Sequence, residues 1–407
     1  MKKSVFILLF TVIFVACKSS ENKASEAQLA TLTDSASLVE QSIVLGAERI
    51  DEYLHLLEEK SIALVVNQTS TIGQTHLVDT LSSLGVNIVK VFAPEHGFRG
   101  DHSAGAIISN GKDPKTGLPV VSLYGKNKKP TAAMLADVDV VIFDIQDVGV
   151  RFYTYISTMH YVMEACAEQN KKVLVLDRPN PNGFYVDGPI LEPAYKSFIG
   201  MHPIPTVHGL TIGELAGMIN GEHWLKGDVQ CDVTVIACQN YSHDSMYQLP
   251  IKPSPNLPNM NSVYLYPYLG MFEGTNVSIG RGTAEPFQIV GRPGYESDFA
   301  FTPVSIPGVS DHPKYENKVC TGFKVNDVAN GDLFSNPRMK LDWLLLFYQS
   351  NEASTGPFFK SFFYKLAGNK TLREQIERGM SEDDIRASWQ EDLSKYKEMR
   401  KKYLLYP

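Results

Sequence analysis

Ile62-Ala-Leu-Val-Val66 is a short, uninterrupted apolar run with polar residues on either side. A strand covered on both faces has this pattern, because neither face meets water. Similar runs follow at Ile88–Phe92, Val138–Ile145 and Lys172–Leu176, and an amphipathic stretch, Tyr155–Glu168, lies between the last two. Strands and helices that alternate at this spacing predict βαβ units with right-handed crossovers, and therefore an α/β domain with a parallel sheet.

This alternating pattern begins at about residue 43 and ends near Lys252-Pro-Ser-Pro-Asn-Leu-Pro258. The closely spaced prolines cannot continue a helix or a central strand. Beyond them the chain is richer in turns and less regular. We therefore predict an α/β domain over residues 43–255 and a smaller α+β domain over residues 256–407. A cleft between two such domains is a natural ligand site.

The first residues have the layout of an export signal. Lys2 and Lys3 precede the apolar run Val5–Ala16, which is too short to span a bilayer, so we predict a signal peptide over residues 1–16. Cys17 follows directly and resembles the lipidated cysteine of a bacterial lipobox. Residues 17–42 would then be a polar tether, and the protein an exported periplasmic or outer-membrane lipoprotein anchored at Cys17. The alternative is an ordinary cleaved signal with an accidental cysteine.

The composition excludes several classes of protein. Of the 407 residues, 43% are hydrophobic and 20% are charged, which supports a sizeable core and excludes a disordered chain. The net charge is −7, so nucleic acid is not an expected partner. The 5 cysteines form no C-x-x-C pair, and G-x-S-x-G, H-E-x-x-H and G-x-G-x-x-G motifs are absent. We expect no metal and no cofactor.

Polar side chains collect where the predicted strands end. Ligands bind beyond the carboxyl ends of parallel strands, so we expect these side chains to share one edge of the sheet. Any one of them alone could be a helix cap or a structural ion pair. The candidates, in chain order, are Asn67, Glu95, His96, Arg99, Asp144, Asp147, Arg151, Tyr153, Arg178 and Asn180.

Glu95 is the sharpest candidate for catalysis, because it directly follows an apolar strand and lies between Pro94 and the turn residue Gly97. A carboxyl group held in a cleft suits a general acid. His96 beside it could act as a base or be a structural residue.

Asp144 and Asp147 are also candidates for catalysis. They point in different directions on an extended segment, so we expect at most one to face the reacting centre and the other to bond to Arg151.

A second dense polar patch, Glu273–Thr283, lies in the predicted smaller domain. Its glycines permit close approach of the backbone to a ligand, and Arg281 can grip a carboxylate through two hydrogen bonds. A turn-rich loop whose polar groups satisfy one another is the alternative.

Six strings together resemble one family, the NamZ-type exo-β-N-acetylmuramidases of glycoside hydrolase family 171. The resemblance runs from about residue 45 to the C-terminus. It implies a Rossmann-like domain joined to a smaller domain, an active site in the cleft between them, and removal of terminal N-acetylmuramic acid (MurNAc) from the non-reducing end of peptidoglycan fragments. The strings are Phe92–Gly100, Asp144–Tyr155, Asp177–Pro181, His208–Glu214, Pro253–Asn256 and Glu273–Thr283.

The resemblance also implies roles for residues. The family's proposed catalytic glutamate corresponds to Glu95, and we hold Asp144, Asp147 and Glu273 as candidates for a second carboxylate. The substrate's own 2-acetamido group could instead be the nucleophile. Muramic acid carries a lactyl carboxylate, which calls for arginine, and sugar faces stack on aromatic rings. The further candidates for substrate binding are Asn67, Phe98, Arg99, Arg151, Tyr153, Tyr155, Arg178, Asn180, His208, Glu273, Asn276 and Arg281.

Two alternatives to an exo-muramidase come from other classes. A lipid-anchored protein that binds muropeptides or sugars without catalysis would share the tether, the two domains and the polar cleft. An amidase or esterase acting on the muramyl group would leave the glycosidic bond whole.

Overall fold

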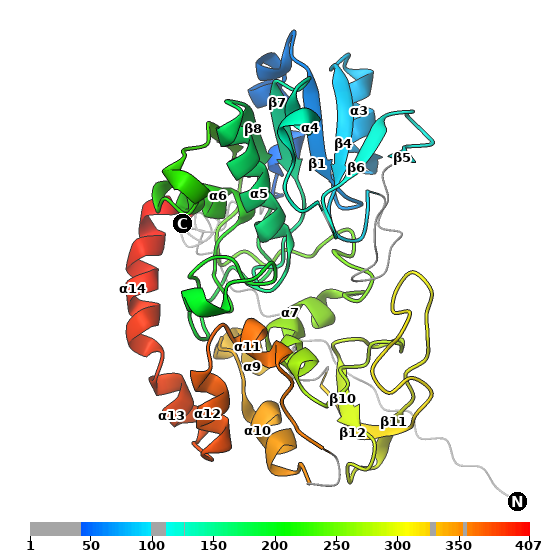
Figure 1. The fold of residues 1–407 in the computed structure, drawn as a ribbon, viewed down its shortest axis with the longest axis vertical. Helices are drawn as coiled ribbons and strands as arrows, with labels where there is room; N and C mark the ends of the chain where they lie inside the picture. The colour runs from blue at the N-terminus through cyan, green and yellow to red at the C-terminus, as the bar shows by residue number, and fades with distance from the viewer. Residues whose placement is uncertain (1–41, 99–110, 126, 326–330, 353–355) are drawn as a thin grey trace, which may run out of the picture. The chain divides into compact units, whose positions relative to one another are not determined.

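The computed structural model describes residues 42–98, 111–125, 127–325, 331–352 and 356–407 (Figure 1). The predicted signal peptide, Cys17, the tether up to residue 41, and Arg99 lie outside the described residues. Residues 43–407 form one compact unit. No helix among the described residues is long and apolar enough to cross a membrane.

A seven-stranded sheet forms the centre of the first part, in the order β5-β6-β4-β1-β7-β8-β9. All neighbouring strands are parallel except the edge pair β5 and β6. Numbered in chain order, the six parallel strands lie as 3-2-1-4-5-6, which is the Rossmann-like topology and confirms the predicted fold class. The strands are β1 (Ile62–Val66), β4 (Ile88–Ala93), β5 (Gly111–Lys112), β6 (Pro119–Ser122), β7 (Val140–Asp144), β8 (Lys172–Leu176) and β9 (Val233–Ile236).

Both faces of this sheet are buried, as the uninterrupted apolar runs predict. In β1, Ala63 and Val65 belong to one hydrophobic core, whereas Ile62, Leu64 and Val66 belong to another on the opposite face. Such alternation follows from the two-residue period of a strand. The helices of this part are α2 (Ile50–Tyr53), α3 (Leu77–Ser83), α4 (Ala132–Leu135), α5 (Tyr155–Glu168) and α6 (Ile212–Gly221), and a small hairpin joins β2 (Thr71–Ile72) to β3 (Thr75–His76).

The second part is smaller and mixes helices with an antiparallel sheet, as predicted. Its three strands lie in the order β10-β12-β11, and the Asn259 side chain caps the helix that opens it. The elements are α7 (Met260–Leu269), the 3-10 turn η5 (Gly270–Gly274), β10 (Ile289–Arg292), β11 (Phe299–Phe301), β12 (Cys320–Lys324), α9 (Asp332–Ser335), α10 (Asp342–Gln349), α11 (Phe362–Ala367), α12 (Thr371–Glu377), α13 (Glu382–Ala387) and α14 (Gln390–Arg400).

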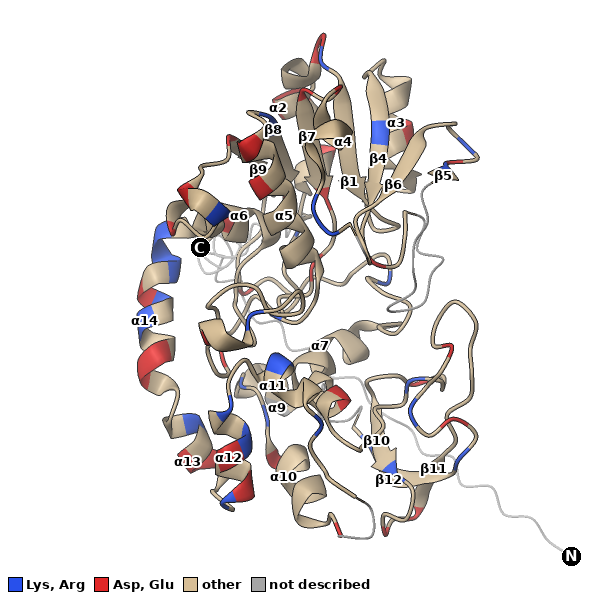
Figure 2. Cartoon of the chain, viewed as in Figure 1, with Lys and Arg blue, Asp and Glu red and all other residues tan. Residues whose placement is uncertain are grey.

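The C-terminal end of the chain returns to the first part. Tyr396 on α14 donates a hydrogen bond to the His208 carbonyl at 2.7 Å, and Tyr406 donates to the Asp177 carboxylate at 2.6 Å. Charged side chains of both signs gather on α12, α13 and α14, whereas the central strands carry few (Figure 2). This distribution follows burial, because the strands are covered and these helices face water.

Candidate active site

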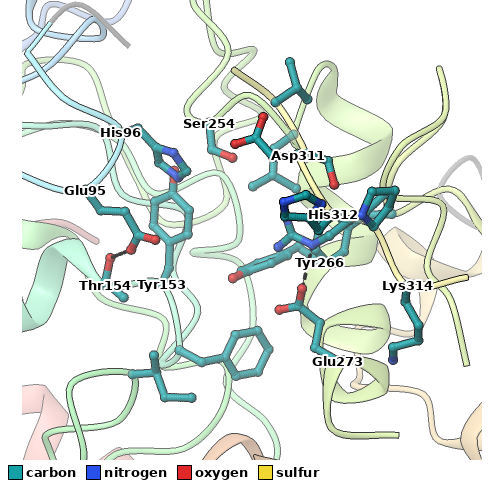
Figure 3. A pocket seen from close by; sticks show the side chains of 18 of the residues that line it. Glu95, His96, Tyr153, Thr154, Ser254, Tyr266, Glu273, Asp311, His312 and Lys314 are labelled. Atoms are coloured by element: carbon teal, nitrogen blue, oxygen red, sulfur yellow. Dashed lines mark hydrogen bonds and ion pairs between the residues drawn. The ribbon is translucent and has the colours of Figure 1, made fainter. Parts of the chain in front are cut away.

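A cavity of about 710 Å³ lies where the loops after β4 and β7 meet the second part of the chain. In Figure 3, Glu95 and Thr154 lie on one side of this cavity, Glu273 and Lys314 lie on the other, and Tyr266 projects between them. The lining residues are Glu95, His96, Tyr124, Phe152, Tyr153, Thr154, Tyr155, Ile199, Ser254, Leu257, Tyr266, Glu273, Arg281, Phe287, Val309, Ser310, Asp311, His312, Pro313, Lys314 and Phe362.

Glu95 reaches the cavity from the end of β4, and its neighbours set its orientation. The Thr154 hydroxyl donates a hydrogen bond to Glu95 Oε2 at 2.7 Å. Burial raises the pKa of Tyr124 well above its usual range, and the nearby Glu95 carboxylate raises it further. His96 turns the chain at φ 70°, in the left-handed region, and it also lines the cavity. The carboxyl group of Glu95 is therefore held in place at the cavity wall.

The opposite wall carries an ion pair. Glu273 lies in η5, and its Oε1 accepts a hydrogen bond from Arg281 Nε at 2.6 Å. The other two guanidinium nitrogens of Arg281 have no hydrogen-bond partner among the described residues. Gly280 and Gly282 have φ of 78° and 80°, and a Cβ on either would lie about 2.5 Å from its nearest neighbour. The glycines therefore make the turn that brings Arg281 to the wall.

Tyrosine side chains form the floor of the cavity. The Tyr153 ring lies edge to face against Tyr155, at 4.9 Å between centroids, and against Tyr266, at 5.8 Å. The Tyr153 hydroxyl donates to the Pro253 carbonyl at 2.8 Å, which joins the floor to the proline-rich segment. Burial raises the pKa of all three hydroxyl groups, so they remain protonated hydrogen-bond donors.

Lys314 is the second cation of the cavity wall. Its ammonium donates to the carbonyls of Phe272, Thr275 and Val277, at 3.2, 2.7 and 2.7 Å. Burial lowers the pKa of Lys314 to about 7, and the charge of Lys360 lowers it further. The ammonium braces the segment that carries Glu273.

Asp144 and Arg178, both predicted as site residues, pair with each other away from the cavity. Arg178 Nε and Nη2 donate to the two carboxylate oxygens of Asp144 at 2.5 and 2.9 Å, and both side chains are buried. Ser70 donates to the backbone carbonyl of Asp144. The pair holds β7 to the loop after β8.

Arg151 pairs with no carboxylate of the described residues, so the predicted bond to Asp144 or Asp147 is wrong. Its guanidinium is fully buried and donates to four backbone carbonyls, those of Pro189, Ile204, Leu366 and Ala367, at 2.6 to 2.9 Å. Because residues 366 and 367 belong to α11, Arg151 joins the two parts of the chain. It does not line the cavity and has no open edge for a substrate carboxylate.

Asp147 and His208 lie behind the tyrosine floor. Asp147 Oδ2 accepts from the Gly149 amide at 2.7 Å, and His208 Nε2 lies 3.7 Å from the same oxygen. Asp147 Oδ1 has no hydrogen-bond partner among the described residues. Burial is the largest cause of the raised pKa of Tyr153, the neighbouring tyrosines come next, and the charge of Asp147 adds to them. Asp147 therefore influences a tyrosine of the floor although it does not line the cavity.

Four further predicted residues have structural roles away from the cavity. Asn67 Oδ1 accepts from the Thr69 amide at 2.9 Å, and Asn180 Oδ1 accepts from the Asn182 amide at 2.8 Å. Asn276 donates to another side-chain amide in the second part. The aromatic ring of Phe98 packs on His76. None of these four predicted residues lines the cavity.

Family models match both parts of the chain. One describes the N-terminal part of exo-β-N-acetylmuramidase NamZ and matches residues 62–261, and the other describes its C-terminal part and matches residues 264–406. The chain belongs to the NamZ exo-β-N-acetylmuramidase family. The chain is therefore a glycoside hydrolase. This family membership favours the enzyme over the alternative of a protein that only binds sugars.

Individual relatives agree with this family. The peptidoglycan β-N-acetylmuramidase NamZ of Bacillus subtilis strain 168 is 36% identical over 432 residues, with 100% of both chains covered. Two crystal structures of DUF1343 family proteins from Bacteroides fragilis cover 90% of this chain and 99% of their own. They have TM-scores of 0.83 and 0.77 at 47% and 31% identity.

Several cavity residues of this NamZ family member could not be identified from the sequence. Thr154 lies inside a string already quoted, but no pattern distinguishes it from its neighbours. Tyr124 and Tyr266 carried no motif, although tyrosines are common at ligand sites. Lys314 lies in an irregular loop and gave no signal at all. Among the described residues, no group of three or more His, Cys, Asp or Glu side chains is placed to hold a metal ion.

Proposed function

We propose that this protein is an exo-β-N-acetylmuramidase that releases the terminal MurNAc from the non-reducing end of peptidoglycan fragments such as MurNAc–GlcNAc, where GlcNAc is N-acetylglucosamine. The observation that carries the proposal is the arrangement of the cavity: Glu95, oriented by Thr154, lies across from the Glu273–Arg281 ion pair. Membership of the NamZ family supports the same reaction.

Glu95 is the proposed general acid. It gives its proton to the glycosidic oxygen as the bond to the leaving sugar breaks. The Thr154 hydroxyl holds Oε2, which fixes the plane of the carboxyl group before substrate arrives. Fixing that plane in advance reduces the cost of orienting the acid at the moment of reaction.

Glu273 is the proposed second carboxylate. Of the three candidates, Asp144 has both carboxylate oxygens paired with Arg178, and Asp147 lies behind the tyrosines. Only Glu273 of the three lines the cavity. It can stabilise positive charge that develops on the sugar ring or orient the 2-acetamido group for attack on its own anomeric carbon. Because Arg281 binds Glu273 through Nε alone, its two Nη atoms are suited to the lactyl carboxylate of MurNAc.

A product assay tests this function. The purified full chain is incubated with MurNAc–GlcNAc and with a chromogenic β-MurNAc glycoside, and products are identified by mass spectrometry. We expect free MurNAc from both substrates and none from the matching β-GlcNAc glycoside, which lacks the lactyl group. An intact glycosidic bond in both MurNAc substrates would refute the proposal, and release of lactate or acetate alone would instead indicate an esterase or amidase.

We also propose that the protein is an exported lipoprotein attached to a membrane through Cys17, because a short apolar run after two lysines ends directly at this cysteine. Cells that express the full chain are labelled with a radioactive fatty acid. Label on the wild-type protein and none on Cys17→Ser is expected. Equal labelling of both proteins, or of neither, would contradict the anchor.

A further inference from the structure

A row of aromatic side chains begins at the wall of the cavity and continues beyond it. Tyr124 lines the cavity, and its ring centroid lies 6.2 Å from that of Phe198. The Phe198 ring is nearly parallel to that of Tyr161 on α5, with 10° between their planes and 6.3 Å between centroids. Parallel rings at this separation are offset sideways, so neither covers the whole face of the other.

Core packing explains only the Tyr124 end of this aromatic row, because Tyr124 packs against the hydrophobic core on one face of the sheet. Tyr124, Phe198 and Tyr161 are all partly exposed. Phe198 and Tyr161 belong to none of the hydrophobic clusters formed by the described residues, although Ile199, next in the chain, lines the cavity. Partly exposed aromatic rings that contact one another next to a cavity are suited to bind a ligand. The C–H face of a sugar ring is a suitable partner, because it is apolar and its hydroxyl groups remain in water.

A lysine that pairs with no acidic side chain of the described residues lies on the same row. Lys128 Nζ is 4.6 Å from the centroid of the Phe198 ring, and no carboxylate of the described residues forms an ion pair with it. The next residue, Lys129, differs in this respect, because it pairs with Glu164 at 2.7 Å and Glu168 at 2.8 Å. Lys128 is therefore placed to meet an anion on whatever stacks against Phe198.

The position of Glu95 tells which side of the scissile bond the row serves. A general acid protonates the oxygen of the leaving group, so it lies between the released sugar and the sugar that follows. Tyr124 is close enough to Glu95 for the carboxylate to act on its hydroxyl group. Because the terminal MurNAc is assigned to the wall of Glu273 and Arg281, we assign Tyr124, and the two rings that follow it in the row, to the leaving group.

We propose that Tyr124, Phe198 and Tyr161 form a binding platform for the sugars that follow the terminal MurNAc, with Lys128 binding the lactyl carboxylate of the next MurNAc along the glycan. This inference rests on the proposed function. It implies that the enzyme processes glycan chains longer than a disaccharide, and that affinity for the leaving side comes from stacking together with one ion pair.

Kinetics on short and long substrates test the platform. The wild type, Phe198→Ala and Lys128→Gln are compared on the chromogenic β-MurNAc glycoside and on the tetrasaccharide MurNAc–GlcNAc–MurNAc–GlcNAc. We expect Phe198→Ala to lower kcat/KM about tenfold on the tetrasaccharide, from lost stacking, and to leave the chromogenic glycoside unchanged. Lys128→Gln should lower kcat/KM on the tetrasaccharide. When the inner lactyl group of the tetrasaccharide is amidated, wild type and Lys128→Gln should have the same kcat/KM.

Two control variants separate the platform from a general effect on folding. Phe198→Tyr keeps an aromatic face and should retain the tetrasaccharide rate, and Phe334→Ala removes an exposed phenylalanine that does not line the cavity. An equal loss on both substrates, or no loss on the tetrasaccharide, would overturn the platform. If the wild type cleaves neither substrate, the proposed function fails by itself. In that case, calorimetry compares the affinities of wild type and Phe198→Ala for the tetrasaccharide. Equal affinities would refute the platform.

Discussion

Two clusters of ionisable side chains, one at the end of β7 and one on the wall of the cavity that the second part of the chain supplies, differ in what completes their hydrogen bonds. In the sealed cluster, Asp144 is paired through both oxygens with Arg178, and their side chains are 0% and 2% exposed. In the open cluster, Glu273 and Arg281 share one hydrogen bond, and their side chains are 25% and 24% exposed at the wall of the cavity.

In this fold, a structural charge has all of its oxygens or nitrogens paired within the protein, whereas a functional charge keeps some of them open to a ligand. Asp144 is the last residue of β7 and lies opposite Val66 of β1, at the point where the strand order reverses. Ligands bind at this point in sheets of this topology. Yet Arg178 occupies both carboxylate oxygens of Asp144, so little capacity remains for a substrate. In the open cluster, the loop brings only Nε of Arg281 to the Glu273 carboxylate, so the two Nη atoms have no partner among the described residues.

Glu95→Gln should give the largest effect on catalysis. The amide keeps the shape of the side chain but cannot donate a proton to the leaving oxygen, so kcat should fall by roughly 10²–10⁴-fold. Thermal unfolding should be unchanged, because the open side of the cavity carries little stability. Kinetics on MurNAc–GlcNAc, whose sugar leaving group needs a proton, and a melting curve measure both quantities. Turnover retained in this variant would remove Glu95 as the general acid.

Asp144→Asn should lower stability and leave kcat unchanged, the reverse of Glu95→Gln. Removal of one charge leaves the Arg178 guanidinium buried and uncompensated, which costs about 3–5 kcal/mol of unfolding free energy. Urea denaturation measures the loss, and kinetics on the fraction that remains folded should give the wild-type kcat. The double variant Asp144→Leu/Arg178→Met should recover much of the stability. A stable Asp144→Asn protein without activity would place Asp144 in the reaction.

The fold could be predicted because its signals are local. Continuous apolar runs report a sheet covered on both faces, and the predicted helix Tyr155–Glu168 has the bounds of α5. The candidate site was only partly predictable: Glu95, His96, Tyr153, Tyr155, Glu273 and Arg281 line the cavity, whereas Asp144, Arg151 and Arg178 do not.

Long-range contacts explain the failures. The four carbonyls that hold Arg151 lie 38 to 216 residues away in the chain, so nothing near Arg151 in the sequence announces them. Asp144 and Arg178 are 34 residues apart and meet because β7 and β8 pair in parallel, with Phe143 opposite Val175. A sequence supplies the type of charged group, but the partner that neutralises it depends on strand register and on loop conformation.

Asp177, a second buried carboxylate that follows β8, gives a smaller and pH-dependent effect. Burial raises its pKa from 3.8 to about 6, although hydrogen bonds from Tyr406 and Thr211 oppose the shift. A raised pKa in the folded state stabilises the protein below the unfolded pKa, and this contribution, about 3 kcal/mol, is lost as the pH rises through about 6. Stability relative to Asp177→Asn should therefore fall between pH 4 and 6. Melting curves of both proteins across this range measure it, and a constant difference would contradict the shift.

Arg281→Lys should give the smallest effect on catalysis, and it tests whether the open cluster binds the carboxylate of the substrate. Lysine keeps the positive charge and can still pair with Glu273, but it lacks the planar fork that would bind the lactyl carboxylate through two further nitrogens. We therefore expect KM for the chromogenic β-MurNAc glycoside to rise about tenfold, the equivalent of one charge-assisted hydrogen bond, with kcat nearly unchanged. The matched control is the same glycoside with its lactyl group amidated, on which wild type and variant should have similar KM values. An equal rise in KM on both substrates would mean that Arg281 serves only to hold Glu273 and does not bind the carboxylate of the substrate.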